Sequence, residues 1–235
     1  MRHGPKPPDE IPLGIGFYAV PEAATLIRTP ARNIQRWLGG YSHKNNGRVT
    51  EIPPLWTPQL PRFDGHLEIG FRDLIELRFV KAFLDAGLGL KTIRNCLEYA
   101  RECAKDDRPF STRRFKTDGR TIFLESLKAS DETELLDLKQ RQYAFKQVVE
   151  RTFRDLDILD ETVARWRPFN GKNSIVVDPG RAFGQPIAAD SGVPTVALAQ
   201  AVEAEDSVER VARIYDVRVE IVRDAVKFEQ SLRAA

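Results

Sequence analysis

Apolar side chains recur every three or four residues in the early segment 18–39, YAVPEAATLIRTPARNIQRWLG. This spacing predicts two short amphipathic helices joined by a tight turn. Pro21 and Pro30 stand in the first turn of each helix, where a missing backbone N–H costs nothing. Thr29 is the predicted N-cap of the second helix, and Gly39 its end. The predicted inward face of the second helix consists of Ile34, Trp37 and Leu38.

The periodicity changes after the second helix. Residues 40–61 hold several prolines and no helical period, which predicts a loop or irregular strand. Two short extended runs flank Asp64-Gly65 and predict a β-hairpin over residues 60–69. A hairpin directly after a helix-turn-helix is a wing. Residues 71–86 and 90–104 then show helical spacing again and predict two amphipathic helices that cover the first pair.

The middle of the chain is predicted to be a small β-rich unit. Residues 114–124 alternate around Asp118-Gly119 and predict a β-hairpin. Further strands are expected within 156–166 and at 174–177, with one amphipathic helix at 143–153.

The last part of the chain returns to helical spacing in three segments, the second of which begins at the capping sequence Asp206-Ser207-Val208-Glu209. The predicted fold class is therefore α+β, mainly α. It has an N-terminal winged helix-turn-helix, a small β-rich middle segment and a C-terminal helical, helix-turn-helix-like domain. The expected divisions are a flexible arm at 1–16, the winged helix-turn-helix at 17–107, a β-rich middle or dimerisation segment at 108–174, and the C-terminal helical domain at 175–235.

Composition is that of a soluble globular protein, with 42% hydrophobic and 30% charged residues. The net charge of +2 hides an asymmetry. Residues 1–120 hold 20 basic and 14 acidic side chains, a balance of +6, and the remainder holds 16 and 20, a balance of −4. A basic front half suits contact with a polyanion. No apolar run has membrane-spanning length, so a cytoplasmic protein that does not bind membranes is expected.

The chain has two cysteines, Cys96 and Cys103, and three histidines. Seven residues along one helix place the thiols about 10 Å apart, beyond disulfide reach. The histidines form no ligand pattern with them, so no metal site is expected. No phosphate-binding loop and no nucleophile with a partner histidine appears. The sequence therefore predicts neither enzyme activity nor a cofactor.

The outer face of the second helix carries the candidate chemistry. Arg32, Asn33, Gln35 and Arg36 lie opposite the apolar face, and Arg, Asn and Gln pair bidentately with guanine and adenine edges in the major groove. Arg and Gln in this position are typical of helix-turn-helix readers, although a solvated basic face is the alternative. The candidate DNA-binding residues are Thr29, Arg32, Asn33, Gln35, Arg36 and, on the expected hairpin, Arg62 and His66.

The order helix, turn, helix, hairpin, helix, helix resembles the DNA-binding domain of the MerR family. The resemblance is carried by residues 18–24, 29–37 and 74–97. It implies a winged helix-turn-helix that binds double-stranded DNA. Residues 40–60 are longer and richer in proline than the corresponding family linker. No long coiled-coil helix and no cysteine metal-sensor loop follows, so metal or drug sensing is not implied.

A second resemblance lies near the C-terminus. Residues 177–187, 191–195 and 207–217 resemble the family called domain of unknown function 433, which is VapB-like. Asp190-Ser191-Gly192 stands where that family commonly has Gly-Thr-Arg, so no role of that arginine carries over. The resemblance implies the antitoxin half of a toxin–antitoxin pair, commonly beside a PIN-like ribonuclease toxin.

Together these observations predict a DNA-binding antitoxin of a type II pair. It would repress its own operon, neutralise a PIN-like toxin and bind a palindromic operator as a homodimer. Two alternatives stay open: a protein–protein adaptor that neutralises a partner without binding DNA, and a one-component MerR-like regulator with no toxin.

Overall fold

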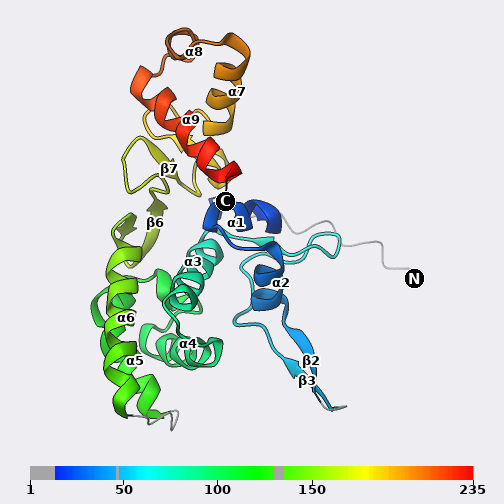
Figure 1. The fold of residues 1–235 in the computed structure, drawn as a ribbon, viewed down its shortest axis with the longest axis vertical. Coiled ribbons are helices and arrows are strands. Elements are labelled where there is room, and N and C mark those ends of the chain that lie inside the picture. Colours follow the sequence, from blue (N-terminus) through cyan, green and yellow to red (C-terminus); the bar gives the residue numbers. More distant parts are fainter. Residues whose placement is uncertain (1–13, 46–47, 130–134, 235) are drawn as a thin grey trace, which may run out of the picture.

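The computed structural model describes residues 14–45, 48–129 and 135–234. Almost all of the expected arm at residues 1–16 lies outside them. The molecule is elongated, with the C-terminal helices at one end of its long axis and the helices of residues 90–153 toward the other (Figure 1). The first two helices of the chain lie between these ends.

The two predicted early helices are confirmed. The N-terminal elements are β1 (Tyr18–Ala19), α1 (Val20–Ile27), α2 (Ala31–Gly39), β2 (Tyr41–Asn45), β3 (Arg48–Ile52) and β4 (Glu68–Ile69). The chain leaves α1 through Arg28, which adopts the left-handed conformation at φ 56°. The Thr29 N–H donates to the Ala24 carbonyl (2.9 Å) and closes this end of the helix.

Residues 40–61, predicted as a loop or irregular strand, contain a regular pair of strands in their first half. Strands β2 and β3 pair antiparallel from Tyr41↔Ile52 to Asn45↔Arg48 and project away from the body of the molecule (Figure 1). The hairpin predicted over 60–69 is reduced to a tight turn. Asp64 and Gly65 have φ values of 47° and 80°, as a two-residue hairpin turn requires. Beyond the turn the chain joins a different partner, because β4 pairs with β1.

Helices α3 (Phe71–Asp85) and α4 (Leu90–Ala104) match the predicted segments. Helix α3 is buried around most of its circumference, because other elements pack on several sides of it. A cluster of aromatic rings fills this core, in which Phe79 contacts the rings of Phe83, Phe110, Phe115 and Phe153. Cys96 and Cys103 on α4 are free thiols, and burial raises the pKa of Cys96 to about 12.

The β-hairpin predicted at residues 114–124 is wrong. A short 3₁₀ turn, η1 (Pro109–Ser111), leads into α5 (Arg113–Ala129). The buried positions of α5 recur at helical spacing: Phe115, Gly119, Ile122, Phe123, Ser126 and Leu127. Arg114 and Asp118 form an ion pair one turn apart (2.7 Å), which favours the helix. The helical spacing of the apolar residues therefore determines the structure of this segment, in spite of the turn signal at Asp118-Gly119. Gly119 is the small residue that lies against Phe115.

Helix α6 (Leu135–Phe153) begins eight residues earlier than the predicted helix. With α5 it makes the segment 108–174 mostly helical, not β-rich. The predicted strands are confirmed in a four-stranded antiparallel sheet of order β5-β6-β7-β8. Its strands are β5 (Leu156–Leu159), β6 (Thr162–Trp166), β7 (Ile175–Val177) and β8 (Pro186–Ala188). One residue pair, Trp166↔Val177, joins the two halves of this sheet.

The C-terminal helices are α7 (Thr195–Glu205), α8 (Val208–Ile214) and α9 (Val219–Arg233), and the short 3₁₀ turn η2 (Ala182–Gly184) precedes β8. The predicted start at Ser207 is confirmed, because its hydroxyl accepts from the Arg210 N–H (3.2 Å). These helices have an apolar cluster of their own, formed with Ala188 of β8. A larger cluster extends from Tyr18 to Val177.

Candidate nucleic-acid interface

Helix α2 has the two faces that the sequence predicts. Ile34, Trp37 and Leu38 are buried, and Arg32, Gln35 and Arg36 are exposed. Thr29 does not cap the backbone of α2 as expected. Pro30 occupies the N-cap position, and the Thr29 hydroxyl accepts from the Asn33 side-chain amide (3.1 Å). This contact ties Asn33 to the turn and leaves the exposed face to Arg32, Gln35 and Arg36.

Arg36 lies over the ring of Tyr41, with the guanidinium carbon 4.0 Å from the ring centroid. This cation–π contact links α2 to the first residue of β2 and restricts the arginine side chain without neutralising it. Arg32 forms no salt bridge with any described residue. The exposed face of α2 therefore keeps its positive charge.

The β2–β3 hairpin extends this surface. Its exposed side chains include Ser42, Lys44, Val49 and Thr50, and Val49 is 62% exposed. Lys44 and Val49 face each other across the two strands near the described ends of the hairpin. A hairpin with exposed side chains on a projecting ribbon suits insertion into a groove or along a phosphate backbone. These residues were not predicted as part of the interface, although Asn46-Gly47 in the sequence is a strong hairpin signal.

The Asp64-Gly65 turn brings the other candidates beside α2. A groove of about 570 Å³ lies between them, and Gln35, Arg62 and His66 line it together. Arg62 donates from Nη1 to the Gly65 carbonyl (3.2 Å). Its Nη2 lies close to the end of α2, since a Cβ atom at Gly39 would be 3.6 Å from it. The structure thus gathers residues that are up to 31 positions apart into one surface.

Glu68 adds a carboxylate to the wall of this groove. It is 8% exposed, and its Oε2 has no hydrogen-bond partner among the described residues. Burial raises the pKa of Glu68 above its ordinary value, and nearby His66 offsets part of the rise. A carboxyl group at this position limits the positive charge of the groove at neutral pH.

A buried polar network holds the segment that connects the hairpin to the turn. The Asp73 carboxylate is fully buried and accepts from Trp56 Nε1 (2.9 Å), the Gln59 N–H (2.6 Å) and Arg108 Nε (2.6 Å). The Leu55 N–H donates to the Trp37 carbonyl at the end of α2 (2.7 Å). Asp73 therefore fixes the frame beneath the candidate interface. Asp73 was not predicted from the sequence, although a carboxylate in the first turn of a predicted helix is the signal that could have identified it.

None of the described helices is long and apolar enough to span a membrane. Among the described side chains, no three His, Cys, Asp or Glu residues gather as a group that would hold a metal ion. The arrangement offers cationic and amide side chains on one helix face, an adjacent ribbon and an adjacent groove. These are the elements of a surface that binds a polyanion and reads base edges.

No protein-family model matches the chain. The chain is 27% identical over 231 residues to a Mycobacterium tuberculosis (strain ATCC 25618 / H37Rv) protein named "Putative antitoxin VapB45", covering 92% of this chain and 95% of that protein. The fold of this chain is similar to that in the X-ray crystal structure of Rv2018 from Mycobacterium tuberculosis. The TM-score is 0.73 at 23% identity, and the match covers 91% of this chain and 99% of that chain. Most of the fold therefore has a counterpart in a solved structure.

Proposed function

We propose that this protein is a VapB-like antitoxin of a type II toxin–antitoxin pair that also binds its own operator. The antitoxin role rests on one observation, the similarity to VapB45 over almost the full length of both chains. In this proposal the protein is not an enzyme, and it acts by binding DNA and a PIN-like ribonuclease toxin.

The exposed face of α2 supports the DNA-binding part of the proposal. Arg32 and Arg36 would contact base edges in the major groove, with Gln35 beside them. The β2–β3 hairpin would act as the wing of a MerR-like domain, with Lys44 on the phosphate backbone. Arg62 and His66 would add contacts from the Asp-Gly turn.

A homodimer on a palindromic operator completes the proposal, since helix-turn-helix readers usually match the two-fold symmetry of their sites. We assign the DNA-binding domain to residues 17–107 and the toxin-binding domain to 175–235. The segment 108–174, with α5 and α6, would hold the dimer contacts.

DNA binding is tested with the upstream region of the protein's own gene. Fluorescence anisotropy between 50 and 200 mM salt should give an affinity that falls steeply with salt. Arg36→Ala should remove about 1–3 kcal/mol of discrimination between operator and unrelated DNA. Arg213→Ala, at an exposed position on α8, removes the same charge and should leave discrimination unchanged. Equal effects of the two substitutions would exclude α2 as the reading helix.

Toxin binding is tested separately by co-expression with the product of the neighbouring reading frame. The two proteins should form a stable complex. The neighbouring gene product should be a PIN-like ribonuclease that is active alone and inactive in the complex. Complex formation without DNA binding would indicate the adaptor, and DNA binding without a toxin would indicate a one-component regulator.

A further inference from the structure

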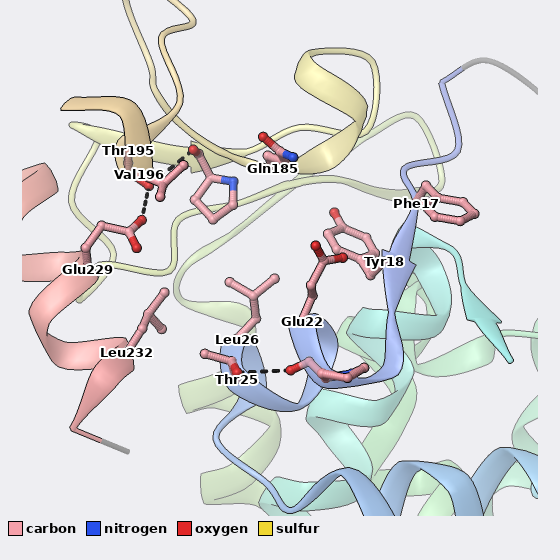
Figure 2. A pocket seen from close by; sticks show the side chains of 12 residues that line it. Phe17, Tyr18, Glu22, Thr25, Leu26, Gln185, Thr195, Val196, Glu229 and Leu232 are labelled. Carbon is pink, nitrogen blue, oxygen red and sulfur yellow. Dashed lines mark hydrogen bonds between the residues drawn. The ribbon is translucent and has the colours of Figure 1, made fainter. Parts of the chain in front are cut away.

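A cleft of about 370 Å³ separates the first helix of the helix-turn-helix from the C-terminal helices. Figure 2 shows Glu22 and Leu26 of α1 on one side, with Val196 of α7 and Glu229 and Leu232 of α9 on the other. The candidate nucleic-acid interface lies elsewhere, on α2 and the hairpin. Neither the DNA-binding nor the toxin-binding proposal uses this cleft.

Hydrogen bonds before and after α1 hold the two walls of the cleft together. Before the helix, the buried Tyr18 hydroxyl donates to the Gly184 carbonyl (2.7 Å), and the Phe17 N–H donates to the Phe183 carbonyl (2.9 Å). After it, Arg28 Nη2 donates to the Ser231 hydroxyl of α9 (3.1 Å). The cleft is therefore a built feature of the joint between the two regions.

The lining of the cleft is mainly apolar and carries negative charge. Leu26, Val196 and Leu232 supply aliphatic surface, and Glu22 and Glu229 supply a carboxylate from each wall. None of the described residues that line the cleft is Lys, Arg or His. A ligand without a positive charge would remove water from these carboxylates and supply no compensating interaction. Such desolvation of a charged group costs free energy.

Both carboxylates keep an acceptor for an incoming group. Glu22 accepts from the Ala19 N–H through Oε2 (3.0 Å), and Glu229 accepts from the Thr195 hydroxyl through Oε1. Each contact engages one oxygen, so the other oxygen of each side chain can accept from an ammonium group. These contacts restrict the two side chains, and Figure 2 shows the one between Glu229 and Thr195.

We propose that this cleft binds a small hydrophobic cation, an amine with an aryl or alkyl body. The volume falls within the range of small-molecule sites, whose lining is mostly apolar with a few placed polar groups. The ammonium group pairs with one of the two carboxylates, Glu22 or Glu229, and the apolar body packs against Leu26, Val196 and Leu232. Because the ligand contacts both walls, its binding is sensitive to the orientation of α1 relative to α9.

The test uses the full chain and three ligands with the same body: 4-phenylbutylamine, 4-phenylbutan-1-ol and 4-phenylbutyrate. Calorimetric titration at neutral pH should show the amine binding at least about tenfold more tightly than the alcohol, with the carboxylate weakest. Methyl resonances of Leu26, Val196 and Leu232 should shift on addition of the amine. Equal affinities for the three ligands, or no binding of the amine, would overturn the proposal.

Variants locate the site independently. Glu22→Gln and Glu229→Gln keep a carbonyl acceptor for Ala19 and Thr195, and at least one of them should lower the affinity for the amine toward that for the alcohol. Glu220→Gln, on the exposed first turn of α9, removes the same charge outside the cleft and should have no effect. An amine affinity that is unchanged in both cleft variants would place the ligand elsewhere and contradict the proposal.

Discussion

The molecule contains two helix pairs of similar layout, α1–α2 and α8–α9, and they differ in charge. On α2, Arg36 stacks on Tyr41 and Arg32 forms no salt bridge with a described residue. Arg218, the N-cap residue of α9, pairs with Asp190 (2.7 Å). On α9 itself, Arg223 pairs with Glu209 (2.7 Å) and Arg233 with Glu203 (2.8 Å). The same supersecondary structure thus leaves the arginines of α2 without carboxylate partners among the described residues in one case and pairs these three arginines with carboxylates in the other.

The two pairs also differ in their support. The first pair rests on a large core in which two carboxyl groups, those of Asp73 and Glu76, are fully buried. The second rests on a smaller, apolar cluster around Leu198 and Val222. A buried charge holds surrounding loops in one arrangement only while its partners are in place. The first pair should therefore be more sensitive to single polar substitutions than the second.

The largest expected effect follows from removal of Asp73. Asp73→Ala leaves the largely buried Arg108 guanidinium and the Trp56 N–H without their acceptor, and should cost about 3–5 kcal/mol of unfolding free energy. Glu203→Ala breaks the exposed pair with Arg233 and should cost less than about 1 kcal/mol. Urea denaturation of both variants measures the difference. Similar losses of unfolding free energy in the two variants would show that the cores beneath the two helix pairs do not differ in this respect.

The second effect concerns pH. Burial raises the pKa of Glu76 from 4.5 to about 7, although hydrogen bonds from Ser111 and Phe110 favour its charged form. Between pH 4.5 and about 7, the Glu76 carboxyl group is therefore protonated in the folded state and deprotonated in the unfolded state. Stability should fall by about 3 kcal/mol as pH rises from 4.5 to 7, and Glu76→Gln should remove this part of the pH dependence. Denaturation of both proteins across this range measures it.

Asp224 on α9 provides the opposite case. Burial alone would raise its pKa, but hydrogen bonds from Lys172 and Ser174 outweigh burial and lower it. Its contribution to stability is present above the ordinary pKa of an aspartate and is lost as pH falls through the lowered value. Asp224→Asn should therefore lower the free energy of unfolding at neutral pH, and its effect should disappear as pH falls through the lowered pKa. For Glu76, the free energy of unfolding should depend on pH differently in Glu76→Gln and in the unsubstituted protein. Identical pH dependence in the two proteins would contradict the effect assigned to the buried Glu76 carboxyl group.

Elements whose side chains repeat against one continuous core were predictable from the sequence. Helix α4 has the predicted bounds, and the inward residues of α2 were identified because three and four residue spacing marks a single buried face. The hairpin of β2 and β3 gave no such signal. Ser42 and Thr50 are exposed on its strands, and so is Val49, so no alternation separates a buried face from a solvated one.

The candidate site was predictable only where one helix carries it. Arg32, Gln35 and Arg36 share the exposed face of α2 because of helical geometry. The groove with Arg62 and His66 depends on where the Asp-Gly turn lies, and that position is set by the contacts of Asp73 with residues 14 to 35 positions away. Contacts over such separations leave no local pattern. Their assignment to DNA stays a prediction.

A smaller effect tests the hairpin. Lys44→Ala should weaken binding to operator and unrelated DNA by the same factor, about threefold to tenfold, because a phosphate contact carries no sequence information. The slope of affinity against salt should fall by about one. Lys227→Ala on α9 is the matched control and should change neither. A loss confined to the operator would show that the hairpin reads bases.

The smallest expected effect concerns the neutralised cations of α9. Asp190→Asn combined with Glu209→Gln releases Arg218 and Arg223 from their exposed ion pairs, which contribute little to stability. Two freed arginines should raise the affinity for unrelated DNA by no more than about threefold at low salt, with no sequence preference. Anisotropy titrations with operator and scrambled duplexes measure both quantities. A gain in sequence preference would mean that α9 can read bases once its carboxylate partners are removed, and the ion pairs, not the helix surface, would then be what separates the two helix pairs.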